Sequence, residues 1–224
     1  MMLHTTSNPD EKQMCISNTN NGTVAKRIQF IGRASHAGGA PHLGINALNA
    51  ATMAMSAINF NRETFRDEDS IRVHPIITKG GEAVSAVPAD VRMETFVRGR
   101  TLEALMDANT KVDRALRAGA MAVGAQVKIQ TIPGYMPLQQ NKDLADIFRA
   151  NAHDLVGEEN VGYVDHRGGS TDMGDISHLM PVIHPYVGGA TGLGHGANYV
   201  IEDYGLALIK AAKALAYTAI DLLA

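Results

Sequence analysis

The sequence is poor in several features that would each indicate a class of protein. Among 224 residues there is one cysteine, Cys15, so a disulfide framework is excluded and a cytoplasmic location is expected. The formal net charge is -3 and Lys and Arg form no cluster, so we expect neither nucleic acid nor a membrane as a partner. The N-terminus lacks the charged segment and apolar run of a signal peptide. The most apolar stretch, residues 204–224, is interrupted by charges and is typical of an amphipathic helix.

Glycine-rich loops are present, but without the residues that complete a phosphate site. Residues 188–198 lack the Lys-Ser/Thr pair of a P-loop and the spacing of a dinucleotide fingerprint, and residues 35–42, SHAGGAPH, fail for the same reasons. No G-x-S-x-G elbow accompanies any serine, although a triad of Ser170, His195 and an aspartate stays possible. Asp172 and Asp175 fit a helix N-terminus at least as well as a catalytic pair.

The middle of the chain alternates strands and helices. We expect strands at 24–32, 71–80, 91–99 and 125–132, and helices at about 44–59 and 102–123. Pro75 places the second strand at a sheet edge or a bulge. The order β-α-β-β-α-β predicts a ferredoxin-like domain over residues 24–136.

The flanking segments predict part of a second domain. Residues 1–21 are polar and irregular, whereas a helix at 142–155, a short helix ending at Leu179, a strand at 180–187 and a terminal helix from about Asp203 are α/β material. These elements are too few for a complete doubly wound sheet. We therefore expect an α/β (α+β) chain in which an intact ferredoxin-like domain is inserted into an incomplete α/β domain of residues 1–23 and 137–224.

Loop histidines are the remaining candidates for chemistry. Neither HExxH nor a CxxC pair occurs, so local spacing gives no strong metal signal. His4 follows an apolar triplet and His195 lies between glycines after a short strand, and sites of open α/β sheets lie at such strand ends. Either imidazole could bind zinc. Taken singly, each is more often a surface or hydrogen-bonded histidine. From the residues alone, a metallohydrolase is thus one possibility.

Four segments together resemble a known family. They are GRASHAGGAPHLGINALNA (32–50), GGEAVSAVPADVRMETFVRGRT (80–101), GGSTDMGDISHLMP (168–181) and GHGANY (194–199). In order and spacing they resemble the aminoacylase, carboxypeptidase G and p-aminobenzoyl-glutamate hydrolase family of dinuclear zinc amidohydrolases, and STDMGD is similar to its aminoacylase-like branch. The resemblance covers nearly the whole chain. It implies a catalytic α/β domain with two zinc ions and an inserted ferredoxin-like lid that forms the homodimer.

The resemblance also implies roles for single residues. His36 would enter the active site of the partner subunit and stabilise the oxyanion formed during amide hydrolysis. Arg98 would pair with a substrate carboxylate. His195 is similar to the last zinc ligand of the family and His4 to its mid-sequence histidine ligand. Ser85 stands where relatives often carry asparagine, so a hydrogen bond from the lid to the substrate is altered or lost.

A larger departure concerns the front of the family pattern. Its His-x-Asp segment and Glu-Glu pair, which supply the other zinc ligands and the general base, have no counterpart in these residues. We therefore expect the C-terminal portion of a zinc-dependent amidohydrolase or dipeptidase for N-acyl-amino acids or dipeptide-like amides, inactive alone and lacking its N-terminal half. The alternative is a non-catalytic dimerisation or regulatory module that retains the lid interface. The sequence leaves open whether His42, His166, His178 and His184 have any role.

Overall fold

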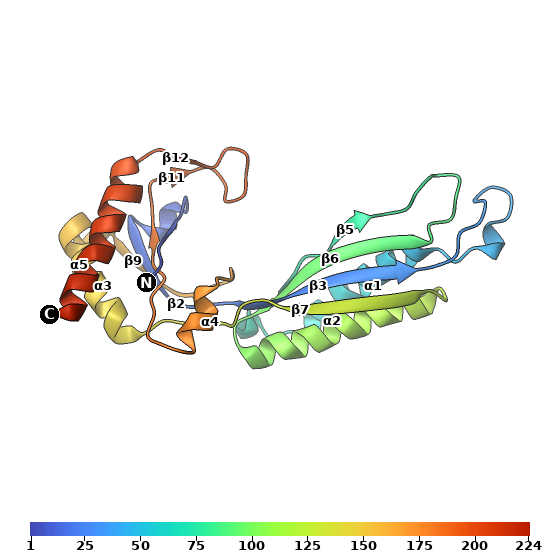
Figure 1. Cartoon of the computed structure of the whole chain (residues 1–224), viewed down its shortest axis with the longest axis horizontal. Helices are drawn as coiled ribbons and strands as arrows, with labels where there is room; N and C mark the ends of the chain where they lie inside the picture. The colour runs from blue at the N-terminus through green and yellow to red at the C-terminus, as the bar shows by residue number, and fades with distance from the viewer. The chain divides into compact units, whose positions relative to one another are not determined.

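A computed structural model describes all residues from 1 to 224. The chain forms two compact units, one made of Met1–Asn20 with Leu138–Ala224 and the other of Asn21–Pro137 (Figure 1). Compared with the boundaries expected from sequence, the inserted unit begins three residues earlier and ends one residue later. No helix has both the length and the apolarity needed to cross a membrane.

The inserted unit contains an antiparallel sheet with two helices packed on it. Its elements are β3 (Gly22–Ile31), α1 (Ala47–Phe60), β4 (Arg72–Val73), β5 (Ile76–Lys79), β6 (Asp90–Gly99), α2 (Leu102–Ala122) and β7 (Gln126–Pro133). The sheet runs from β4 and β5 through β6 and β3 to β7. In chain order this places the second strand outermost, then the third, first and fourth, which is the ferredoxin-like arrangement. The predicted fold class is confirmed (Figure 1).

Proline divides the second strand of this sheet. Pro75 separates β4 from β5, and both segments pair with β6 at the edge of the sheet. The register shifts within β5, between Ile77 and Lys79. A proline lacks the amide that the ladder requires, so the single strand predicted at 71–80 becomes two short ones.

The core of the inserted unit follows the predicted periodicities. Val91, Met93 and Val97 of β6 are fully buried at every second position. Leu105, Val112 and Leu116 form the buried face of α2. Between the helices the contact is made by small residues: Ala47, Ala50, Ala51, Ala54, Ala108, Ala115, Gly119 and Ala120. The two helix backbones therefore approach closely.

Replacing Gly119 tests this close approach. A Cβ atom at Gly119 would lie 2.5 Å from the amide nitrogen of Ala54 and 2.6 Å from the carbonyl oxygen of Ala50. Gly119→Ala should therefore lower the free energy of unfolding of this unit by about 1–3 kcal/mol. Helix propensity alone predicts the opposite sign, a gain of about 1 kcal/mol. Urea unfolding distinguishes the two, and a stabilised variant would show that the helices are not in close contact.

The second unit is built around a strand that the sequence pattern did not predict. Its strands are β1 (His4–Thr5), β2 (Met14–Asn20), β8 (Leu138–Gln139), β9 (Val161–Arg167) and β10 (Tyr186–Val187), with a separate hairpin of β11 (Ala190–Thr191) and β12 (Val200–Ile201). β2 pairs with β9 in parallel and with β8 and β10 antiparallel, and β10 continues in parallel to β1. Helices α3 (Lys142–Val156) and α5 (Ala211–Leu223) pack on Met14 and Ile16 of β2. Short helical elements complete the unit: η1 (Pro9–Glu11), η5 (Glu158–Asn160), α4 (Met173–Ser177) and the π-helical η6 (Gly205–Lys210).

Two predictions for this unit were wrong, and one strand was missed. Residues 1–21 are not irregular, because β2 is a buried central strand whose polar Ser17 and Asn20 are almost inaccessible. The strand expected at 180–187 is reduced to β10, because two prolines, Pro181 and Pro185, interrupt it. The strand β9 was not predicted at all.

Candidate active site

His4 and His195 lie in one cleft of the second unit. The cleft has a volume of about 880 Å³ and is lined by His4–Pro9, Tyr186, Gly192–Gly196 and Tyr199. His4 reaches it from β1, and His195 comes from the loop between β11 and β12. A hydrogen bond of 2.9 Å between the hydroxyls of Thr5 and Tyr199 spans the same cleft. His4 and His195, which are 191 positions apart in the chain, thus line the same cleft.

The hydrogen bonding of His4 fixes which ring nitrogen is available. Its Nδ1 lies 3.1 Å from the carbonyl oxygen of Thr5, which can only accept, so Nδ1 carries the proton. A neutral imidazole has one N–H, and Nε2 therefore keeps its lone pair. A metal-binding histidine commonly donates its second N–H to a backbone carbonyl in this way. His4 is thus suited to be a ligand through Nε2.

His195 has a backbone conformation that is unusual for a residue with a side chain. Its φ is 63°, in the left-handed region, and it is flanked by Gly194 and Gly196. The turn is closed by a 2.7 Å hydrogen bond from the Gly196 amide to the Leu193 carbonyl. Such a conformation costs about 1–2 kcal/mol for a non-glycine residue, and such outliers cluster at functional sites.

The donors in this cleft suit part of a metal site. His4 and His195 are both exposed to the cleft and carry the nitrogen donors that zinc prefers. No group of three or more His, Cys, Asp or Glu side chains in the 224 residues is arranged to hold a metal ion. A catalytic zinc usually takes three protein ligands, so these two account for only part of such a site.

His36 lies on an exposed loop of the inserted unit and has the opposite tautomer. Its backbone forms a β-bridge with Ala86, and the amide of Ala37 donates to the carbonyl of Ser85 at 2.8 Å. Its Nδ1 accepts hydrogen bonds from the amides of Gly38 and Gly39, at 3.1 and 2.9 Å. Because Nδ1 is an acceptor, the proton of a neutral ring lies on Nε2. The loop therefore presents an N–H donor.

Arg98 and Ser85 are also in the inserted unit. Arg98 lies at the end of β6, half-buried, with its guanidinium carbon 5.3 Å from the centre of the Phe96 ring. It forms no ion pair within the chain and pairs in register with Arg72 of β4. Ser85 is exposed in the loop before β6, beside the His36 bridge. The structure thus brings His36 and Ser85 together and leaves the charge of Arg98 unneutralised.

Comparison with known proteins places the inserted unit in a family. Residues 18–123 match the family model described as a peptidase dimerisation domain. The chain is 32% identical over 207 residues to the Xaa-Arg dipeptidase of Mus musculus, covering 88% of this chain and 47% of that protein. Residues 18–123 are thus an M20 peptidase dimerisation domain, and the whole chain resembles M20 peptidases and aminoacylase-like amidohydrolases.

One further curated relative and one solved structure are also similar to the chain. Carboxypeptidase G2 of Pseudomonas sp. (strain RS-16) is 27% identical over 172 residues, which are 75% of this chain and 39% of that protein. A solved amidase of the hydantoinase/carbamoylase family from Burkholderia vietnamiensis has the same fold, with a TM-score of 0.81 at 17% identity over 98% of this chain and 53% of that one. The chain thus spans about half the length of the curated relatives it matches.

Sequence reasoning missed a cluster behind the cleft of the chain. His184 is 1% exposed, and neither of its ring nitrogens has a hydrogen-bond partner. Its ring stacks on Tyr186, over which the guanidinium of Arg167 lies at 3.7 Å, and Arg167 binds Glu11 at 2.6 Å. Burial and the neighbouring His4 lower the pKa of His184 to about 4. No local sequence motif marks this cluster, because its members come from four separate segments.

The surroundings of Glu11 and of the nearby Cys15 determine the charge states of these two side chains. Burial alone would raise the pKa of Glu11, but hydrogen bonds from Arg167, Thr6 and Asn8 outweigh it and the pKa is lowered. Burial raises the pKa of the Cys15 thiol. Glu11 is therefore ionised and Cys15 protonated at neutral pH, so the thiol is not activated as a nucleophile.

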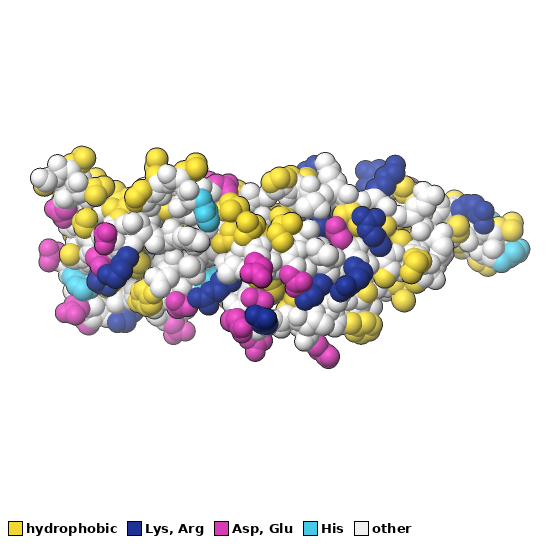
Figure 2. Space-filling model, turned by 90° about the horizontal axis from the view of Figure 1, so that it is seen from below, with side chains coloured by type: hydrophobic (Ala, Val, Ile, Leu, Met, Phe, Trp, Pro, Cys, Tyr) yellow, Lys and Arg dark blue, Asp and Glu magenta, His cyan; other side chains and the backbone are white.

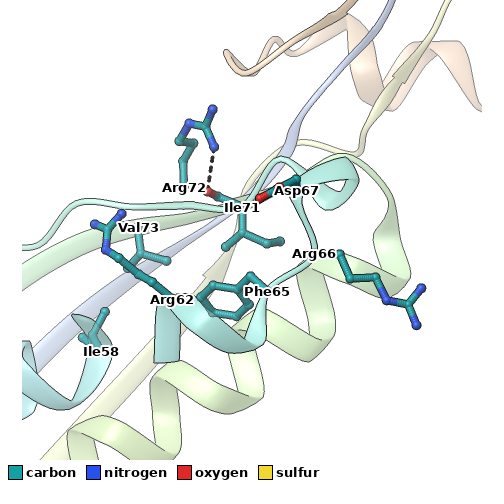
Figure 3. Close-up of a pocket in the computed structure, with 8 residues that line it drawn as sticks. All are labelled: Ile58, Arg62, Phe65, Arg66, Asp67, Ile71, Arg72 and Val73. Carbon is teal, nitrogen blue, oxygen red and sulfur yellow. Dashed lines mark hydrogen bonds between the residues drawn. The ribbon is translucent and has the colours of Figure 1, made fainter. Parts of the chain in front are cut away.

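A second hollow lies in the dimerisation domain, and Arg72, the register partner of Arg98, is in its lining. It has a volume of about 330 Å³, and Phe65, Ile71 and Val73 line it (Figure 3). Arg66 extends away from the other labelled side chains, and Arg72 donates to the carbonyl of Ile71 at 2.9 Å (Figure 3). Both acidic and basic side chains reach the surface on the face in Figure 2.

Proposed function

We propose that this chain supplies the dimerisation domain and part of the metal-bearing domain of a zinc-dependent amidohydrolase or dipeptidase. Its substrates would be N-acyl-amino acids or dipeptide-like amides. The observation that carries the proposal is the pair of opposite tautomers, in which His4 offers a lone pair and His36 offers an N–H. Amide hydrolysis at a metal needs both, a ligand for the ion and a donor for the oxyanion.

Each candidate site residue then has one role. Zinc, when bound, supplies Lewis-acid polarisation of the carbonyl and activation of water. His4 and His195 hold the ion from two sides of the cleft. His36 donates its Nε2–H to the carbonyl oxygen as negative charge develops there, and Arg98 pairs with the free carboxylate of the substrate. Ser85, beside His36, offers a shorter hydroxyl where many relatives carry an asparagine amide.

The dimerisation domain offers a surface for a second copy. The outer edge of β5 is unpaired, and its Ile76 and Ile77 are exposed. Helix α1 packs over β6 on the same side of the domain and exposes Met53 and Phe60. An unpaired edge next to an apolar helix surface is a template for strand pairing between two chains. We propose a homodimer in which β5 and α1 of both subunits meet and His36 acts in the partner's active site.

The two histidines leave the remaining metal ligands and the general base to residues outside these 224. We infer that the chain alone does not hydrolyse these substrates. Incubation of the purified chain with zinc and a set of N-acyl-amino acids and Xaa-Arg dipeptides should give no turnover above a His36→Ala sample. Zinc-dependent hydrolysis that disappears in His36→Ala would show that the chain contains a complete site.

The alternative function is a dimerisation or regulatory module without catalysis, which the incomplete donor set favours. Metal binding distinguishes it from the first proposal. In calorimetric titration with zinc, the chain should bind one ion weakly, and His4→Ala and His195→Ala should each abolish that binding. His42→Ala, which removes an exposed histidine of the other unit, is the matched control and should leave it unchanged. Zinc binding that persists without His4 and His195 would contradict the proposed metal site.

A further inference from the structure

His184 is the most unusual polar side chain outside the residues assigned above. It is 1% exposed, yet both ring nitrogens lack hydrogen-bond partners. Leaving a buried polar atom unpaired costs about 1–3 kcal/mol, so an apolar residue of similar size would be more favourable at this position. A buried polar group without a hydrogen-bond partner in a folded protein therefore calls for an explanation, such as a functional role.

The neighbours of His184 form a column of rings that ends at the cleft. Arg167, paired with Glu11, lies over the Tyr186 ring at 3.7 Å. Tyr186 and His184 are stacked, with ring centres 5.1 Å apart and planes at 26°. His184 meets His4 edge-on, at 6.1 Å and 67°, and Tyr186 also meets His4, at 5.8 Å and 42°. The ring of His4 therefore has two aromatic neighbours, His184 and Tyr186.

The backbone beneath this column is tied to the central strand. The amide of His184 donates to Gln140 Oε1 at 2.7 Å, and Gln140 Nε2 in turn donates to the carbonyl and, at 3.1 Å, to the hydroxyl of Ser17 in β2. Tyr186 is paired in register with His4, so the two side chains are direct neighbours on adjacent strands. Tyr186 thus stands on β10, and His184, two residues before it, is held through its backbone amide by Gln140. Accurate placement of a ligand requires such support.

We propose that His184 and Tyr186 are positioning residues that hold the ring of His4 in its ligand orientation. This rests on the proposed function, in which His4 is a metal ligand. The Thr5 carbonyl fixes the tautomer of His4, and the two rings restrict rotation about its side-chain bonds, so that Nε2 is preorganised. Arg167 and Glu11 hold Tyr186 from behind. Such outer partners of a ligand typically contribute about 10–100-fold to metal affinity.

Nitrogen-proton correlation spectra of the metal-free chain test this directly. In the wild type, His4 should show a single tautomer with the proton on Nδ1, ring-current-shifted ring protons, and cross-relaxation to Tyr186. In Tyr186→Leu and His184→Leu the ring-current shift should be lost and the two His4 nitrogens should average. Tyr186→Phe keeps the ring and should restore the wild-type pattern. Tyr217→Phe, which removes an exposed hydroxyl of α5 outside the cleft, is the matched control and should leave the His4 ring unchanged.

Several outcomes would overturn the proposal. One is a wild-type His4 with averaged tautomers and no contact to Tyr186, a measurement that needs no variant to fold. Another is an unchanged His4 ring in both leucine variants while their backbone amide spectra stay dispersed. A separate zinc titration reports on the metal itself: a roughly tenfold weaker affinity in Tyr186→Leu is expected. If no zinc binds while the ring pattern is as described, the proposed function fails and the positioning of His4 stands.

Discussion

Asp113→Asn should lower the free energy of unfolding of the dimerisation domain by about 3–5 kcal/mol, nearer the lower figure because the Asp113 side chain is 29% exposed. The side chain of Lys26 is fully buried, and its Nζ lies 2.5 Å from Asp113 and 2.9 Å from the Thr131 hydroxyl. Without the carboxylate, the ammonium group stays buried with neutral partners only. Hydrogen exchange of the amides in β3 and β6 reports on this domain alone and measures the loss.

Two variants separate the buried charge from the loss of any surface ion pair. Asp107→Asn removes the exposed partner of the half-buried Lys111 on the same helix and should cost less than about 1 kcal/mol. The double variant Lys26→Met with Asp113→Leu removes both charges and should recover most of the stability, since apolar replacement of a buried pair is often neutral. An Asp113→Asn protein as stable as Asp107→Asn would mean that Lys26 is solvated and not buried.

The second large effect concerns pH and the metal-free second unit. The pKa of His184 is lowered to about 4 from 6.5 by burial, by His4 and by Arg167, with Asp172 opposing. Between pH 6.5 and 4 the unfolded chain binds this proton and the folded chain does not, so the free energy of unfolding falls as the pH is lowered through that range. The loss attributable to His184 should reach about 3 kcal/mol at pH 4.

Comparison of variants isolates this contribution from that of the other histidines. The glutamine side chain does not titrate. The difference in unfolding free energy between His184→Gln and the wild type should therefore change by about 3 kcal/mol from pH 6.5 to pH 4. His42→Gln, which removes an exposed imidazole of the other unit, is the control for the substitution itself. A His184→Gln profile parallel to that of the wild type would show that His184 is protonated equally in both states.

The dimerisation domain could be predicted because its signals are local. Alternation in β6 and helical spacing in α2 identify both elements, and Pro75 marks the division of the edge strand. The second unit could not be predicted to the same extent. In β2 the buried positions include Ser17 and Asn20, whose hydrogen bonds come partly from each other. Only the tertiary structure makes such polar residues acceptable in a core.

The candidate site, too, could be predicted from the sequence only in part. The SHAGG segment could be identified from sequence, but the tautomer of His36 follows from two glycine amides that only the folded loop presents. His4 and His195 were proposed separately, and their shared cleft depends on parallel pairing of β1 with β10. His184, whose role the sequence left open, lies behind His4 because residues 4 and 186 are partners in that pairing.

Sedimentation equilibrium of the purified chain is the most direct test of the central claim, that this is an M20 dimerisation domain carrying residues of a shared site. At about 10 µM the wild type should sediment as a dimer of about 48 kDa, twice the 23.9 kDa of the chain. Ile77→Lys places a charge on the edge of β5 and should give a monomer. Met121→Lys, which changes an exposed residue of α2, is the matched control and should remain dimeric. A monomeric wild type, or a dimer that survives Ile77→Lys unchanged, would contradict the account.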